Sequence, residues 1–72
     1  MSKVALRKIE GIVLELLPNT TFKVETGNGE TVLATLKGKL RRSYVRVFPG
    51  DRVKIELPPH DDKRGRIIQK LR

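Results

Sequence analysis

Apolar and polar residues alternate along most of this chain, and a repeat of two residues predicts β-strands. The alternation recurs in five segments, which are separated by short polar stretches. Strands of this kind bury one face against a core and leave the other in water. The predicted strands are residues 8–17, 20–26, 31–36, 52–57 and 66–71.

Glycine and proline mark the breaks between the predicted strands. Pro18-Asn19 follows the first strand, Gly27-Asn28-Gly29 follows the second, and Pro49-Gly50 precedes the fourth. We expect the Asn-Gly pair to form a tight primed turn. Both central residues of such a turn have a positive φ angle, which asparagine and glycine tolerate. Gly11 lies inside the first strand and predicts a bend there, as small barrels require.

Residues 39–45 depart from the repeat of two. Leu40 and Tyr44 stand four apart, which places them on one side of a short helix. Three strands, a short helix and two further strands describe an OB-fold, a five-stranded, partly open Greek-key barrel. We therefore predict an all-β protein with a single domain over residues 1–72, of which residues 1–6 form a flexible arm.

The charge of the chain limits the kinds of molecule that it is expected to bind. It carries 16 Lys and Arg against 8 Asp and Glu among 72 residues, for a net charge of +8. Such a surface favours polyanions, which are rRNA, DNA or acidic lipid, and its binding weakens steeply with salt. The longest apolar runs are far below the ~20 residues of a membrane span, and the N-terminus lacks a signal-peptide core. We expect a cytoplasmic protein, with an organellar matrix as the alternative.

The sequence gives little support for disulfide bonds, metal binding or catalysis. Cysteine is absent, so disulfides and thiolate zinc sites are excluded, and His60 is the only histidine. Asp61-Asp62 beside it are interpreted as part of a charged turn rather than as metal ligands. Because no catalytic combination of residues is present, we expect no enzyme, no metal and no cofactor.

Basic residues gather in two groups that contain no acid. No acidic residue lies between Glu30 and Asp51, and none follows Asp62. In an OB barrel the loop between the last two strands flanks the usual oligonucleotide face. The first group is Lys37, Lys39, Arg41, Arg42 and Arg46, and the second is Lys63, Arg64, Arg66, Lys70 and Arg72.

Aromatic residues are scarce, whereas proteins that bind single strands stack bases on several rings. Phe22 alternates with Val24 and is predicted to lie in the core, and so is Phe48 beside Val47. Tyr44 either plugs the barrel end with Leu40 or contacts RNA. Recognition is therefore predicted to rest on phosphates and on RNA shape more than on base stacking.

Two strings of residues resemble the bacterial-type translation initiation factor 1 family. One runs from Gly38 through Arg41-Arg42-Ser43-Tyr44-Val45-Arg46 to Val47, and the other is Leu17-Pro18-Asn19. The resemblance extends over residues 9–70. It departs from the family at His60-Asp61-Asp62, where members often have Tyr-Asp-Leu, so any role of that loop's aromatic residue is in doubt.

The resemblance implies an OB-fold factor that binds rRNA of the small ribosomal subunit at the A site of the decoding centre, beside a ribosomal protein. Such a factor blocks early tRNA entry and assists the other two initiation factors, and we expect it to be a monomer. The implied RNA contacts are Lys39, Arg41, Arg42, Tyr44, Arg46, Lys63, Arg64 and Arg66, with Lys23 as a weaker candidate.

Two rival hypotheses remain open. A general single-strand RNA chaperone of the cold-shock type would bind any single strand tightly, although the low aromatic count opposes it. A basic structural subunit or protein-interaction module would instead show little salt-dependent RNA binding and a stable protein partner.

Overall fold

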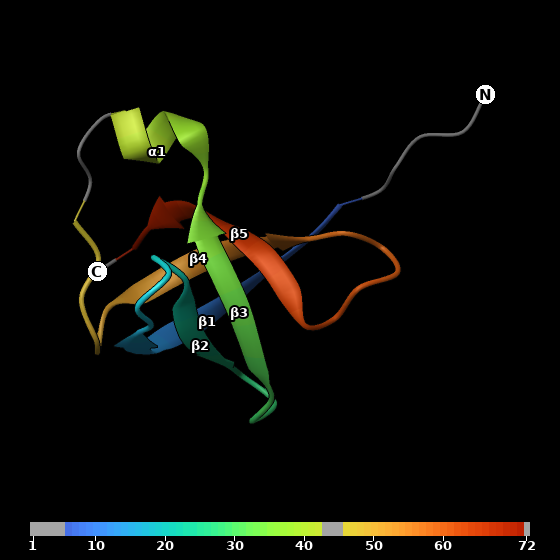
Figure 1. Ribbon diagram of the computed structural model, residues 1–72. Coiled ribbons are helices and arrows are strands. Elements are labelled where there is room, and N and C mark those ends of the chain that lie inside the picture. Colours follow the sequence, from blue (N-terminus) through green and yellow to red (C-terminus); the bar gives the residue numbers. More distant parts are fainter. Residues whose placement is uncertain (1–5, 43–45, 72) are drawn as a thin grey trace.

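The computed structural model describes residues 6–42 and 46–71. Five strands and one short helix form among these residues, and the strands close into a barrel in the order β1-β2-β3-β5-β4, with α1 above one end (Figure 1). The predicted OB-type architecture, with its helix between the third and fourth strands, is confirmed. The elements are β1 (Arg7–Leu16), β2 (Phe22–Thr26), β3 (Thr31–Leu36), α1 (Gly38–Arg42), β4 (Arg52–Leu57) and β5 (Arg64–Lys70).

One pair of strands closes the barrel in parallel. β3 and β5 run in the same direction, with Leu33 beside Arg64 and Leu36 beside Ile67, while the other four pairs are antiparallel. A parallel pair cannot be joined by a hairpin. The chain therefore leaves β3 through α1, crosses the barrel end and returns along β4 before β5 adds to the edge of β3.

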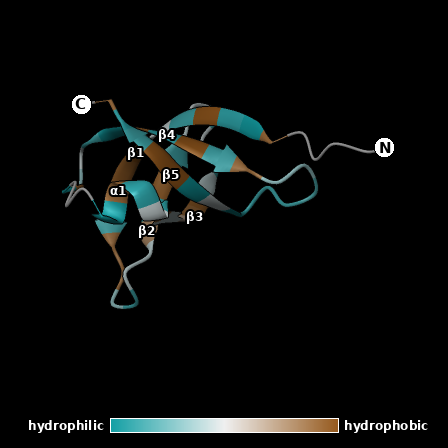
Figure 2. Ribbon diagram, turned by 90° about the horizontal axis from the view of Figure 1, so that it is seen from above, coloured by the Kyte–Doolittle hydropathy of each residue, from teal (hydrophilic) through white to brown (hydrophobic). Residues whose placement is uncertain are grey.

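The core fills the barrel with the inward faces of the strands. Apolar and polar positions alternate along much of the strands in Figure 2, and the buried positions of the described strands are apolar except for Thr26. Val53, Ile55 and Leu57 of β4 are buried at every second position. Phe22 is only 6% exposed and lies in the core, as predicted. The buried apolar residues of the described chain are Val13, Phe22, Val24, Val32, Ala34, Val47, Val53, Ile55, Leu57 and Ile67.

The irregularity of β1 does not lie at its glycine. The register with β2 shifts between Val13 and Glu15, so Leu14 is the extra residue of a bulge. Gly11 instead allows close approach, since a Cβ there would lie 2.6 Å from Val24 Cγ1 and 2.7 Å from the Glu25 carbonyl oxygen.

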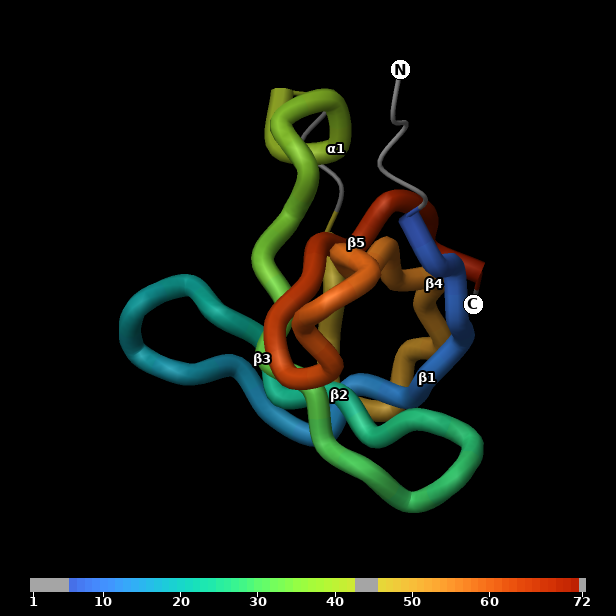
Figure 3. The backbone as a smooth tube through the Cα atoms, turned by 90° about the vertical axis from the view of Figure 1, so that its right-hand side faces the viewer, coloured from blue at the N-terminus to red at the C-terminus, as the bar shows by residue number. Residues whose placement is uncertain are grey.

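The β1–β2 and β2–β3 hairpin loops project from opposite sides of the barrel (Figure 3) and have the same backbone hydrogen-bond pattern. The Thr26 amide donates to the Glu30 carbonyl (2.8 Å) and the Gly29 amide to the Thr26 carbonyl (3.0 Å), with φ +84° at Gly29 only. This is a three-residue loop that ends in a left-handed residue, so the predicted primed turn is wrong. In the β1–β2 loop the left-handed residue is Thr20, with φ 61°, which keeps it out of the predicted second strand.

Two further predictions fail for identifiable reasons. β5 begins at Arg64, two residues earlier than predicted, because the Leu33 amide donates to the Lys63 carbonyl (2.8 Å) and pairing with β3 starts there. Phe48 is 54% exposed rather than buried, because its neighbour Val47 takes the inward position. Residues 43–45 of the predicted helix, and residues 1–5 of the predicted arm, lie outside the described part of the chain.

Candidate nucleic-acid interface

The helix α1 presents basic side chains at one end of the barrel. Leu40 packs partly buried against the core and fixes the inner side of the helix, whereas Lys39, Arg41 and Arg42 are exposed. Basic residues in the last turn also suit the negative end of the helix dipole. Since five residues make a helix too short to be stable alone, its position depends on these attachments to the barrel.

A backbone hydrogen bond joins α1 to the second basic group. The Lys37 amide donates to the Ile67 carbonyl at 3.0 Å, directly before the helix begins. Arg64 and Arg66 are exposed on the outside of β5, while Ile67 points into the barrel. At about 3.3 Å per residue, β5 carries the basic row from the foot of the helix to Arg64 within roughly 10 Å. The fold thus places the basic residues of α1 next to Arg64 and Arg66 of the second group, on the α1, β3 and β5 side, whereas Arg72 lies outside the described residues.

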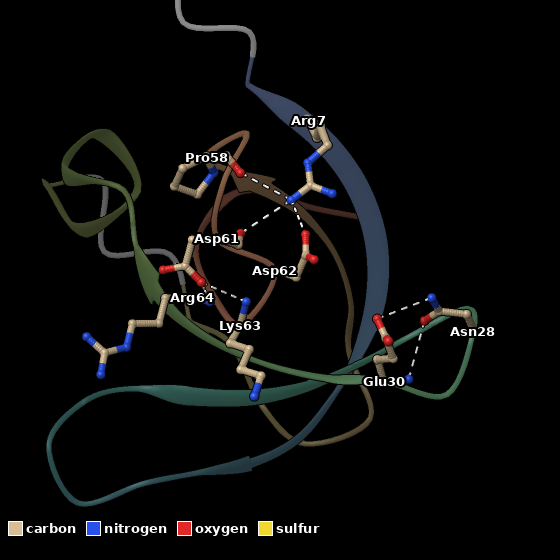
Figure 4. Close-up of polar contacts among 8 residues, drawn as sticks. All are labelled: Arg7, Asn28, Glu30, Pro58, Asp61, Asp62, Lys63 and Arg64. Carbon is tan, nitrogen blue, oxygen red and sulfur yellow. Dashed lines mark hydrogen bonds and ion pairs between the residues drawn. The ribbon is translucent and has the colours of Figure 1, made fainter.

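Hydrogen bonds hold the loop before β5 in shape (Figure 4). The Asp61 carboxylate accepts the amides of Lys63 (2.9 Å) and Arg64 (3.2 Å). The amide of Lys63 is the main cause that lowers the pKa of Asp61 below its ordinary value. These bonds direct the Lys63 and Arg64 side chains outward, and the loop is therefore preformed at the edge of the candidate interface.

The same loop is tied to β1. Arg7 forms an ion pair with Asp62 and donates to the Pro58 carbonyl at 3.1 Å (Figure 4). Of the two carboxylates in this turn, Asp62 therefore has a structural role, because it pairs with a cation of β1.

Ion pairs separate the cations of the described chain into two sets. Lys23 pairs with Glu15 (3.8 Å), and Lys37 with Glu56 (4.0 Å). Lys70 pairs with Asp51 at 3.5 Å. Of the predicted contacts, those that make no ion pair with any described residue are Arg41, Arg42, Arg46, Lys63, Arg64 and Arg66.

The predicted contacts are not all equally placed. Arg66 lies opposite Glu56 in the β4–β5 ladder, although the ion pair of Glu56 is made with Lys37. Lys23 lies on β2, with its side chain 42% exposed and paired with Glu15, away from the helix and β5. Tyr44 lies outside the described residues, so its predicted contact has no structural description.

An apolar hollow opens beneath α1 on the same end of the barrel. It measures about 430 Å³ and is lined by Leu16, Thr20, Phe22, Leu36 and Arg41. The bulge at Leu14 shifts the phase of β1, so Leu16 pairs with Phe22 and faces this opening. The hollow borders the basic surface through Arg41.

Sequence reasoning missed a cluster at the end of β5. There Lys70 pairs with Asp51, donates to the Arg46 carbonyl, and has its Nζ 6.0 Å from the centroid of the Phe48 ring. The alternation of buried Val47 with Phe48 was the signal that could have placed this ring outside. Elsewhere, no helix within residues 6–42 and 46–71 has the length and apolar character needed to cross a membrane.

Comparison with known proteins agrees with this geometry. The solution structure of translation initiation factor 1 from the Wolbachia endosymbiont strain TRS of Brugia malayi is 40% identical, with a TM-score of 0.79 over 93% of this chain and 79% of that one. YjeQ from Thermotoga maritima is 31% identical, with a TM-score of 0.75 over 92% of this chain but 23% of its own. Residues 3–72 match the family described as translation initiation factor 1A / IF-1. This chain therefore belongs to that family of non-enzymatic, RNA-binding initiation factors.

Proposed function

We propose that this protein binds rRNA at the A site of the decoding centre of the small ribosomal subunit and blocks early tRNA entry there. Membership of the family supports binding to the small subunit. The observation that carries the proposal is the set of exposed cations on α1 and β5 that make no ion pair within the described residues. Their charge is available to neutralise rRNA phosphates.

The proposed mechanism combines electrostatic docking with exclusion. Arg41 and Arg42 are adjacent on a helix, so they diverge around its axis and reach phosphates that approach from different sides. Arg64 and Arg66 share one face of β5 and follow a single stretch of backbone. The closed barrel behind them is rigid and occupies the volume that a tRNA would otherwise fill.

Binding of purified small subunits over a salt series tests this proposal. We expect saturable binding. The logarithm of its association constant should fall against the logarithm of the salt concentration with a slope of several units, up to about −5 if about six phosphates are contacted. Arg41→Ala and Arg46→Ala should each weaken binding and reduce that slope by about one. Arg52→Ala is the matched control, because Arg52 lies beside Glu10 and Glu25 on the outer side of β1 and β2.

Other outcomes would contradict the proposal. Large subunits and free single-stranded RNA serve as competitors, and equal binding to all three would favour a general RNA chaperone. A slope near −1 would remove the electrostatic docking step. Loss of binding in Arg52→Ala equal to that in Arg41→Ala would mean that the site is assigned to the wrong face.

The remaining parts of the proposal follow from this location. We propose that a ribosomal protein beside the decoding centre forms part of the docking surface, and that the other two initiation factors act together with this one. We further propose that it acts as a monomer in the cytoplasm, or in an organellar matrix where translation begins in the same way. Lys39, Lys63 and Tyr44 complete the proposed contacts, with Lys23 as the weakest.

A further inference from the structure

Phe48 is an aromatic ring held outside the core on a fixed piece of backbone. Its side chain is 54% exposed, whereas Phe22, the other aromatic residue that the structure describes, is buried. The Phe48 amide donates to the Asp51 carboxylate at 2.8 Å, and the Asp51 amide donates back to the Phe48 carbonyl at 3.0 Å. The Gly50 amide and the Asp51 carbonyl bond Val13 of β1, at 2.7 and 2.9 Å. The turn that presents the ring is therefore anchored to the barrel.

Lys70 of β5 completes the support of this ring. Its Nζ donates to the Arg46 carbonyl at 2.9 Å, pairs with Asp51 at 3.5 Å and lies 6.0 Å from the centroid of the Phe48 ring. One side chain thus links the end of β5, the turn and the segment that leaves α1. Because these groups engage the ammonium, we expect it to support the ring rather than to contact a phosphate.

The surroundings of the ring suit a nucleic-acid base. Arg46 is exposed two residues away, and the nearby carboxylate of Asp51 is neutralised by Lys70. A flat apolar ring beside cations, with no unpaired carboxylate among these residues, complements an unpaired base and its phosphate. Such stacking tolerates any base, since every base has a π face.

We propose that Phe48 is a stacking platform for one unpaired base of the bound RNA, and that Asp51 and Lys70 are its positioning residues. This inference rests on the proposed function, since the base belongs to the rRNA that the basic surface binds. It adds a base contact to an interface that otherwise rests on phosphates. It also predicts that Lys70 contributes nothing to the salt slope of binding.

A single tryptophan tests the contact directly, because the chain contains none. In Phe48→Trp the indole replaces the ring, and purified small subunits should quench its emission by stacking without moving it to shorter wavelength. Thr31→Trp is the matched control, since Thr31 is exposed on β3 opposite Glu25, and its emission should not change. Sedimentation with the subunits measures binding independently of fluorescence.

Two further variants separate stacking from charge. Phe48→Leu keeps an apolar side chain but removes the π face, and should weaken binding roughly 5- to 100-fold with an unchanged salt slope. Lys70→Met should weaken binding with an unchanged slope, whereas loss of a phosphate contact would lower the slope by about one. Circular dichroism checks that both variants retain the barrel.

The outcomes are distinguishable. Binding without quenching in Phe48→Trp, or brighter emission at shorter wavelength, which indicates contact with a protein surface, would overturn the inference and leave the proposed function intact. Unchanged affinity in Phe48→Leu, or a reduced slope in Lys70→Met, would also overturn it. Failure of the unsubstituted protein to sediment with small subunits would overturn both.

Discussion

At the scale of single residues, two glycines set how closely strands approach. A Cβ at Gly65 would lie 2.6 Å from the Glu56 carbonyl oxygen, 2.7 Å from Leu57 Cδ2 and 2.8 Å from Ile55 Cγ2. The first of these is a backbone atom of a paired strand, so it cannot rotate away as a flexible side chain would. Gly65 also lies between Arg64 and Arg66, and its close fit therefore fixes the strand that carries both cations.

We predict that Gly65→Ala destabilises the protein by about 1–3 kcal/mol, the usual cost of forcing an extra methyl group into a packed site. Gly38→Ala is the control with the opposite sign, because nothing lies within 4 Å of the position that a Cβ would take there and φ is not positive. Alanine in the first turn of α1 should be neutral or stabilising by up to about 1 kcal/mol. Urea unfolding measures both, and equal stability of the two variants would show that β5 can shift without cost.

The ion pair of Lys23 affects how readily this residue, the weaker candidate, could contact RNA. Lys23 and Glu15 are 3.8 Å apart with both side chains substantially exposed. Exposed pairs of this kind contribute typically about 0–1 kcal/mol, so roughly that much free energy is lost when the pair opens. Lys23 can therefore turn to RNA at little cost, although its position on β2 separates it from the main basic surface.

At the scale of elements, the β1–β2 and β2–β3 hairpin loops have the same backbone hydrogen-bond pattern although their residues differ. The Leu17 amide donates to the Thr21 carbonyl (2.8 Å) and the Thr20 amide to the Leu17 carbonyl (3.2 Å), which repeats the pattern of the β2–β3 loop. The left-handed position is Gly29 in one loop and Thr20 in the other. A β-branched residue with positive φ is strained, whereas glycine and asparagine accept this conformation.

We predict that Thr20→Asn stabilises the protein by about 0.5–1 kcal/mol, because it relieves part of a strain of roughly 1–2 kcal/mol. For a domain of this size the melting temperature should rise by roughly 2–8 °C. Thr21→Asn is the control, since Thr21 does not have a positive φ angle. Thermal unfolding by circular dichroism compares the two, and an equal gain in both would refute the strain at Thr20.

Sequence patterns predicted the presence of the strands better than their bulges and boundaries. In β2, β3 and β4 the buried residues recur at every second position, because burial of one face is a local consequence of a two-residue repeat. The bulge at Leu14 left no local signal, since it depends on the register with β2. The early start of β5 at Arg64 depends likewise on pairing with β3, far away in the sequence.

At the scale of the whole molecule, charge predicted the candidate interface and packing completed it. Two basic groups were visible in the sequence, but their adjacency arises from the parallel β3–β5 pair and the bond between Lys37 and Ile67. Phe48 was assigned to the core because it is large and apolar. Its exposure depends on Val47 filling the inward position, which single-residue hydrophobicity does not reveal.

The excess of positive charge affects folding and binding in opposite directions. With a net charge of +8 over 72 residues, the folded barrel repels itself, and the four exposed or partly exposed ion pairs of the described residues offset little of that repulsion. Salt screens this repulsion over about 10 Å at 0.1 M. Added salt also reduces the gain from counterion release when RNA is bound, because the released ions enter a more concentrated solution.

We predict that raising salt from about 50 to about 500 mM increases the melting temperature by several degrees while it weakens binding to small subunits steeply. The double variant Arg41→Gln/Arg42→Gln lowers the net charge from +8 to +6. It should therefore melt at a higher temperature in low salt, respond less to added salt and bind with a shallower salt slope. A melting temperature that falls with salt would mean that the ion pairs outweigh the repulsion, and the basic surface would then stabilise the fold rather than oppose it.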